Sequence, residues 1–298
     1  MSAALTIMRA GPLTSIQDAG RFGMLRHGIS ASGPMDGAGF AQAGALAGGG
    51  RGAVEFTMAG LDIRLEQGQC RVGFAGGGFA ARHNGRTVDW PGSLQLHAGD
   101  VLAITPGPWG NYGYLRFAAD IDVPPVMGSL ATSSRAQLGG LAGRVLRAGD
   151  VIGLTGSGAG TAAEASRPEP VSGPIRVNWG LHADLFPQHL RQRFLATAFT
   201  VSSRLDRMGV RLEDAGNVFA GAAALSLVSD AIVPGDIQIL GDGTPIVLMR
   251  DHQPTGGYPR IATIIGADLD RFAQLRPGSP VAFEPVTVEH AHALLRSR

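Results

Sequence analysis

The chain contains no lysine, since every one of its 25 basic residues is arginine. A lysine Schiff base and a P-loop lysine on a nucleotide phosphate are therefore excluded. Covalent attachment of biotin or lipoate to a lysine of this chain is excluded as well. If the process uses ATP or a carrier-bound cofactor, we expect partner chains to handle it.

Cysteine is nearly absent too, with Cys70 as its single representative. One cysteine allows neither an intrachain disulfide nor a multi-cysteine zinc site. Cys70 lies in the strand-like stretch 65–74 without a nearby histidine, so we predict a buried structural thiol. His290 and His292 fall two residues apart in a predicted helix and do not face each other, so we predict no metal site.

Charge is scarce as well. Charged residues make up 16% of the chain and the net charge is +1, which argues against a nucleic-acid or anionic-membrane surface. No apolar run approaches the roughly 20 residues of a membrane span. The first six residues lack the features of a signal peptide. We therefore expect a cytoplasmic protein.

Glycine, with 45 residues, and short apolar runs are what the sequence has in abundance. Apolar runs that alternate with Gly, Asp and Pro turns indicate many short strands. Helical spacing appears in only three segments, 35–46, 186–197 and 289–298. The pattern predicts a mainly β protein with a few short helices, in the class of barrels or sandwiches.

Two lobes are expected, 1–155 and 174–298, joined by a linker or long loop at 156–173. The turn and strand at 146–154 resemble those at 275–283, which favours a duplication. A third copy of this turn and strand lies at 96–101, and it is explained by the glycine turns that recur in β proteins. Gly-Ser-Gly-Ala-Gly at 156–160 superficially resembles a dinucleotide loop, but no amphipathic helix follows it.

The densest group of polar side chains follows an apolar strand predicted at 245–249. Two glycines and two prolines fix the path of the loop at 250–260. Polar groups on a stiff loop after a core strand are typical of binding and catalytic sites. A tight connection that merely needs Gly and Pro is the alternative. The candidate site residues of this loop are Asp251, Gln253, Thr255 and Tyr258.

Three further segments carry candidate site residues. Gln17, Asp18 and Arg21 could bind a carboxylate or an amide, or could brace a glycine turn. His27 and Ser32 could line a substrate loop, although the segment around Ser32 also has the pattern of a turn that caps a helix. Arginine alternates with apolar residues at 204–213, as in a strand with one charged face. Arg207 and Arg211 there could hold an anion or form solvated surface.

Taken together, these segments resemble the allophanate-hydrolase-subunit-2-like family, also described as biotin-dependent carboxyltransferase-like. The family includes the C subunit of bacterial ATP-dependent 5-oxoprolinase and the antagonist of a sporulation kinase inhibitor. The resemblance covers nearly the whole chain. Its carriers, in order, are Gln17–Arg21, Ser32–Asp36, Glu55, Trp90, Ala98–Asp100, Asp122–Pro124, Arg207–Leu212 and Asp251–Ile261.

The resemblance implies two cyclophilin-like β-barrel lobes and a multi-subunit, ATP-dependent amidohydrolase that opens 5-oxoproline to glutamate. It implies a partner protein of the subunit-1-like type. In 5-oxoprolinase this partner is the B subunit, and the resemblance implies a third chain there, the A subunit. ATP would be handled by partner chains. Asp251 or Asp18 could act as general base if burial raises its pKa.

Two other functions stay open. One is a carboxyltransferase component that receives biotin from another chain and acts on urea or a similar amide. The other is a non-enzymatic regulator that sequesters its partner. The sequence departs from the family pattern at Leu130 and Ala131, where Arg and Ser are usual, and at Pro254, where Thr is usual. Arg is also often found where Tyr112 stands. The loss of an arginine from a ligand loop favours the regulator slightly, because leucine cannot make its charge-assisted hydrogen bonds.

Overall fold

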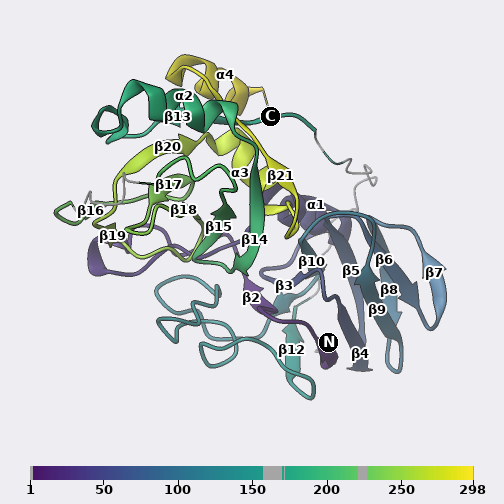
Figure 1. Ribbon diagram of the computed structural model, residues 1–298. Coiled ribbons are helices and arrows are strands. Elements are labelled where there is room, and N and C mark those ends of the chain that lie inside the picture. The colour runs from purple at the N-terminus through teal and green to yellow at the C-terminus, as the bar shows by residue number, and fades with distance from the viewer. Residues whose placement is uncertain (1–2, 157–169, 171, 221–226, 298) are drawn as a thin grey trace. The chain divides into compact units, whose positions relative to one another are not determined.

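The computed structural model describes residues 3–156, 170, 172–220 and 227–297. The chain forms two compact units (Figure 1). Unit 1 comprises Met1–Phe22 and Ala31–Pro170, and unit 2 comprises Gly23–Ser30 and Val171–Arg298. Most of the linker expected at 156–173, including nearly all of the Gly-Ser-Gly-Ala-Gly motif, lies outside the described residues. Nothing in the sequence pattern indicated that residues 23–30 would group with unit 2.

Unit 1 is built from two antiparallel sheets. The strands of the larger sheet are, in spatial order, β11 (Asp120–Ile121), β12 (Val151–Thr155), β1 (Ala3–Ala10), β4 (Leu61–Gln67), β9 (Val101–Pro106), β6 (Phe79–His83) and β7 (Arg86–Val88). Those of the smaller sheet are β2 (Ser15–Gln17), β3 (Ala53–Thr57), β10 (Tyr112–Phe117), β5 (Gln69–Gly76) and β8 (Gly92–His97).

One apolar core belongs to both sheets of unit 1. In β4, Leu61, Ile63 and Leu65 are buried while the residues between them are partly exposed, which is the alternation of a strand with one face on a core. They join Phe56 of β3 and Phe74 of β5 in the same cluster. This cluster makes the two sheets one packed body.

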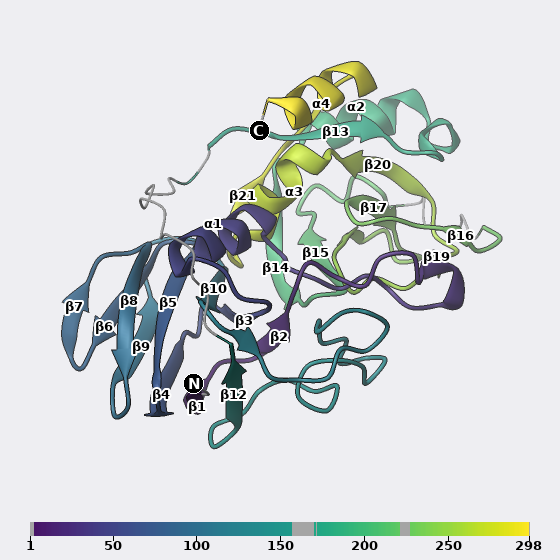
Figure 2. The ribbon, with the colours of Figure 1, turned by 180° about the vertical axis from the view of Figure 1, so that it is seen from behind.

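Helix α1 (Gly37–Ala47) lies against β5 and β10 of unit 1 (Figure 2). It begins where the Asp36 carboxylate accepts a hydrogen bond from the Gly39 amide at 2.9 Å, a typical N-cap. Gly73 of β5 allows the close approach, because a Cβ there would clash with the Ala43 carbonyl oxygen. The helix therefore fixes the turn at 32–36 that precedes it.

Unit 2 contains one eight-stranded sheet, a short two-stranded one, and helices α2 (Gln188–Ala196), α3 (Gly266–Ala273) and α4 (Val288–Arg296) (Figure 1). All strand pairs of the large sheet are antiparallel except β13–β22. Its order is β21 (Pro280–Val281), β14 (Phe199–Leu205), β15 (Gly209–Glu213), β18 (Pro245–Leu248), β17 (Asp236–Ile239), β20 (Arg260–Ile264), β13 (Ile175–Trp179) and β22 (Phe283–Pro285). The two-stranded sheet pairs β16 (Asp230–Ala231) with β19 (Thr255–Gly256).

Phenylalanine rings form much of the apolar interior of unit 2. Phe194 of α2 stacks on Phe283 of β22, with ring centroids 4.9 Å apart, and also contacts Phe199 and Phe219. All four rings are 3% exposed or less. Such packing explains why α2 forms here, since its apolar residues Leu190 and Phe194 fall on one face.

The mainly β fold class is confirmed, as are the three predicted helices. Cys70 is buried in β5 as predicted, and its burial raises the pKa of the thiol. The prediction of one charged strand over 204–213 was wrong. The segment is a hairpin of β14 and β15, and Asp206 closes its turn by accepting hydrogen bonds from the amides of Met208 and Gly209. Helix α3 was not predicted. Among the described residues, no helix is long and apolar enough to span a membrane.

Candidate functional site

The loop after β18 is anchored by a buried ion pair. Arg207, in the β14–β15 turn, donates from Nε to one oxygen of Asp251 at 2.9 Å and from Nη2 to the other at 3.2 Å. The side chains are 7% and 6% exposed. The Asp251 amide also donates to the Arg207 carbonyl at 2.7 Å. Both are predicted site residues, and the structure shows that each binds the other.

The remaining predicted residues of this loop lie closer to the solvent. Thr255 is exposed on β19, where it pairs with Ala231. Tyr258 is 42% exposed, and its carbonyl accepts a hydrogen bond from Gln238. Gln253 is half-buried. The buried ion pair at one end and the β16–β19 pairing at the other hold these three polar side chains on a braced loop.

His252 is a buried imidazole that sequence analysis did not name as a candidate. It is 3% exposed, and its Nδ1 lies 2.6 Å from the Gln253 carbonyl oxygen. Because a carbonyl can only accept, Nδ1 carries the proton and Nε2 is left as an acceptor. Burial lowers the pKa of His252 and outweighs two opposing effects, first the hydrogen bond with the Gln253 carbonyl and then the charges of Asp236 and Asp251. The ring is therefore neutral near pH 7.

A second charge cluster, centred on the buried Arg260, lies at the start of β20. The Arg260 guanidinium, 8% exposed, contacts Asp230 at 2.5 Å and Asp236 at 3.4 Å. Asp236 also accepts from the Thr263 hydroxyl at 2.7 Å. This cluster fastens the β16–β19 pair to the large sheet. No local pattern indicated it, because Asp230 and Asp236 are distant from Arg260 along the chain.

In unit 1, Asp18 is the centre of a hydrogen-bond network. Its carboxylate accepts from the Ser129 hydroxyl at 2.5 Å, the Leu130 amide at 2.7 Å and the Gly20 amide at 3.0 Å, and Arg51 lies 3.4 Å away. Burial acts to raise the pKa of Asp18, but these donors outweigh it and the pKa lies below its usual value. The raised pKa on which a general-base role depended is thus absent at Asp18.

Gln17 and Arg21 also bind main chain of unit 1. Gln17 Nε2 donates to the Thr132 carbonyl at 3.1 Å, and its Oε1 accepts from the Gly33 amide at 3.1 Å. Arg21 is 1% exposed and donates to the carbonyls of Val126 and Ala131 at 3.0 and 2.8 Å. Together with Asp18, these two side chains hold the segment 126–132 in place.

The turn at 33–36 is held by side chains of the smaller sheet. Glu55 accepts from the Met35 amide and from the Tyr114 hydroxyl, each at 2.8 Å, and the Asp36 amide donates to that hydroxyl at 2.7 Å. Burial first, and then the charges of Glu55 and Asp36, raise the pKa of Tyr114 well above its usual value. The phenol therefore keeps its proton and remains a donor.

Ser32 stands out in this well-bonded turn. Its φ is +55°, in the left-handed region that non-glycine residues rarely adopt. The residue is 4% exposed, and its Oγ has no hydrogen-bond partner among the described residues. Strain and an unsatisfied buried hydroxyl at one position are typical of a functional site. Ser32 is thus a predicted residue of unit 1 whose buried hydroxyl the described residues leave unsatisfied.

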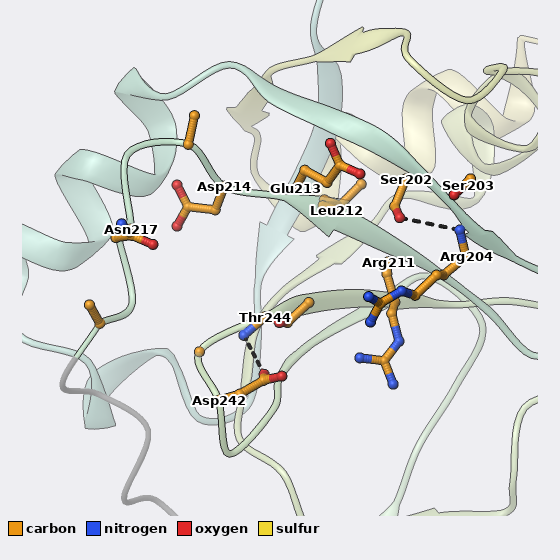
Figure 3. Close-up of a pocket in the computed structure, with 13 residues that line it drawn as sticks. Ser202, Ser203, Arg204, Arg211, Leu212, Glu213, Asp214, Asn217, Asp242 and Thr244 are labelled. Carbon is orange, nitrogen blue, oxygen red and sulfur yellow. Dashed lines mark hydrogen bonds between the residues drawn. The ribbon is translucent and has the colours of Figure 1, made fainter.

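Two predicted residues lie elsewhere in unit 2. His27 is exposed in a short 3-10 helix, Leu25–His27, next to the Arg26 guanidinium. Arg211 lines a cavity of about 530 Å³ beside β14 and β15 (Figure 3). The lining of that cavity includes Arg204 and Asp242 but no residue of the 250–260 loop. The structure therefore does not bring Arg211 into one cavity with Asp251.

The model of the "Carboxyltransferase domain, subdomain A and B" family matches residues 27–285. The chain belongs to this family. Relatives include the C subunit of 5-oxoprolinase from Escherichia coli, 36% identical over 96% of this chain and 93% of the relative. The C subunit of 5-oxoprolinase from Haemophilus influenzae is 33% identical over 95% of this chain and 91% of the relative. The crystal structure of Kluyveromyces lactis urea carboxylase superposes with a TM-score of 0.89 at 28% identity and covers 99% of this chain, which spans 28% of that protein.

The departures of this carboxyltransferase-domain chain from the expected motifs have structural counterparts. Leu130, where arginine was expected, is 1% exposed and belongs to the core of unit 1. Its amide, rather than its side chain, binds Asp18. Pro254 accepts at its carbonyl from the Ile232 amide at 3.4 Å, so the loop keeps a main-chain contact there.

Proposed function

We propose that this chain is the C subunit of an ATP-dependent 5-oxoprolinase, which opens 5-oxoproline to glutamate as part of a multi-subunit complex. The observation that carries the proposal is the similarity to the corresponding 5-oxoprolinase chain of Escherichia coli along almost the whole of both proteins. A match over almost the whole of both proteins is stronger support for a shared role than a common fold would be.

The proposed reaction breaks the C–N bond of the lactam. A water molecule supplies the oxygen that the carbonyl carbon gains, and the nitrogen leaves with a proton as the amine of glutamate. The lactam is unstrained, so its carbonyl needs activation, for which we propose ATP hydrolysis. Since these 298 residues contain no lysine for a P-loop, we propose that ATP binds to partner chains that correspond to the A and B subunits of such a complex.

The 250–260 loop of unit 2 offers the groups that we propose for substrate contact: the amide of Gln253 and the hydroxyls of Thr255 and Tyr258. Asp251 uses both carboxylate oxygens on Arg207, so we assign it a positioning role. The neutral imidazole of His252 is the proton acceptor that the loop provides. In unit 1, the Ser32 hydroxyl is the corresponding candidate for a ligand contact.

A carboxyltransferase component is the second candidate function. It is favoured by the TM-score of 0.89 to Kluyveromyces lactis urea carboxylase. In this case biotin would be carried by another chain, because this one has no lysine to attach it. The two functions differ in the substrate consumed and in the need for a biotin carrier.

The experiment is a glutamate-release assay on the chain co-expressed with its partner subunits, with ATP and 5-oxoproline. We expect ATP-dependent release that Gln253→Ala lowers about tenfold or more, as expected when a polar substrate contact is lost. Gln95→Ala, on the partly exposed edge strand β8, is the matched control and should behave as wild type. Full activity of Gln253→Ala would refute the site assignment. A complex that assembles tightly and releases no glutamate would refute the proposed function and point to the regulator.

A further inference from the structure

A β-bulge in unit 2 places two arginines side by side. Between the pairs Val201↔Leu212 and Leu205↔Val210, β14 has three residues where β15 has only Arg211. The register at Leu205↔Val210 puts Arg204 across from Arg211. Bulges of this kind redirect side chains and are frequent near binding sites. Both arginines extend into the same cavity of about 530 Å³ (Figure 3).

Neither guanidinium has an ion-pair partner in the part of the chain that the structure describes. Among the described residues, no hydrogen bond or ion pair reaches the Arg204 or Arg211 guanidinium. Hydrogen bonds from Thr244 lower the pKa of Asp242, and the charge of Arg211 lowers it further, to a smaller extent. Like charges directly across an antiparallel pair are destabilising. Two adjacent guanidinium groups form a ready site for a carboxylate, which each can bind through a pair of hydrogen bonds.

The same cavity also carries negative charge. Glu213 lies two residues after Arg211 on β15, so the two side chains emerge on the same face of the strand about 7 Å apart. Both line the cavity, and no ion pair joins them. The third nearby carboxylate, Asp214, accepts hydrogen bonds from the amides of Gly216 and Val218. Glu213 is therefore a carboxylate of the cavity with no hydrogen bond or ion pair among the described residues.

We propose that this cavity binds a free α-amino acid in its zwitterionic form, with the carboxylate on Arg204 and Arg211 and the ammonium group on Glu213. Arg204, Arg211 and Glu213 all line this cavity, which therefore offers groups of both charges to a ligand that carries both. The Ser202 hydroxyl, whose oxygen accepts from the Arg204 amide at 3.2 Å, has its proton available for the ligand carboxylate.

The two-charge recognition is independent of the proposed activity. Only the choice of L-glutamate as the probe rests on the proposed function, because glutamate is the product of the proposed reaction. Binding to the full chain is measured by isothermal titration calorimetry without partner subunits or ATP, so a failure of this inference is separate from a failure of the enzymatic proposal. Glutarate, which lacks the ammonium group, and inorganic phosphate are the comparison ligands.

We expect L-glutamate to bind more tightly than glutarate or phosphate by about tenfold or more. Arg204→Gln and Arg211→Gln should each weaken glutamate binding by about tenfold to a hundredfold, the loss expected for a charge-assisted hydrogen bond. Glu213→Gln should weaken the binding of glutamate and leave the binding of glutarate unchanged. Arg82→Gln, on the exposed face of β6, is the control and should bind as wild type.

Equal binding of glutarate and glutamate would overturn the assignment of Glu213 and with it the amino-acid proposal. Absence of glutamate binding, or binding that survives both arginine substitutions, would overturn the site itself. Far-UV circular dichroism of each variant establishes that it is folded, and the exposed positions of Arg204 and Glu213 make these substitutions compatible with folding.

Discussion

Removal of the Asp251 carboxylate should destabilise unit 2 substantially. In Asp251→Ala, the Arg207 guanidinium remains buried at 7% exposure but loses its two hydrogen bonds to the carboxylate, at 2.9 and 3.2 Å. Breaking a buried ion pair by removing one partner costs about 3–5 kcal/mol, because the remaining charge is left in a poorly solvated place. We expect a loss of this size in the free energy of unfolding, measured by urea denaturation with circular dichroism.

Two further variants test the reasoning. The double variant Arg207→Met, Asp251→Leu should be more stable than Asp251→Ala, because it leaves no buried charge behind. Asp184→Ala removes an ion pair with Arg191 at the surface, where the Asp184 side chain is 97% exposed, and should leave stability unchanged. If Asp251→Ala lost less than about 1 kcal/mol, the anchor described for the loop would be incorrect.

Three other outcomes follow from the geometry of unit 1. The pKa of Asp18 in the folded chain lies below its usual value, so its contribution to stability is present above the unfolded pKa and is lost as the pH falls through the folded pKa. Asp18→Asn should therefore flatten the acid limb of the stability–pH curve, and an unchanged limb would contradict the network. Ser32→Gly should raise the melting temperature, because glycine adopts φ of +55° without strain, and should lower glutamate release in the complex, whereas a lower melting temperature would argue against strain. Leu130→Arg should destabilise unit 1, because its side chain lies in the core. An unchanged urea midpoint would show that the position tolerates the family's arginine.

The sequence predicted those features that depend on local pattern. Alternating apolar residues in β4 and the helical spacing of Leu190 and Phe194 are local signals, so strands and helices could be located. Helix α3 was not predicted because it is only eight residues long and begins next to a strand. Its Asp268 is held by Arg176 at 2.6 Å, a contact 92 residues apart that no local pattern shows.

The candidate site was predicted in composition but not in arrangement. Asp251 and Arg207 were predicted from separate segments, and their pairing across 44 residues is a property of the fold. The conditional role of Asp18 as a base depended on burial, but three hydrogen-bond donors and the charge of Arg51 outweigh the effect of burial. His252 was not singled out because a histidine gains its protonation state from its surroundings, which the sequence does not show.

The central claim is tested most directly by comparing two substrates in the assembled complex. The chain and its partner subunits are purified together, and ATP consumption is measured with 5-oxoproline and, separately, with urea in the presence of a biotin carrier. The proposed function predicts ATP consumption with 5-oxoproline and equimolar release of glutamate, and none with urea. ATP consumption that requires urea and the biotin carrier, with no glutamate formed, would contradict it.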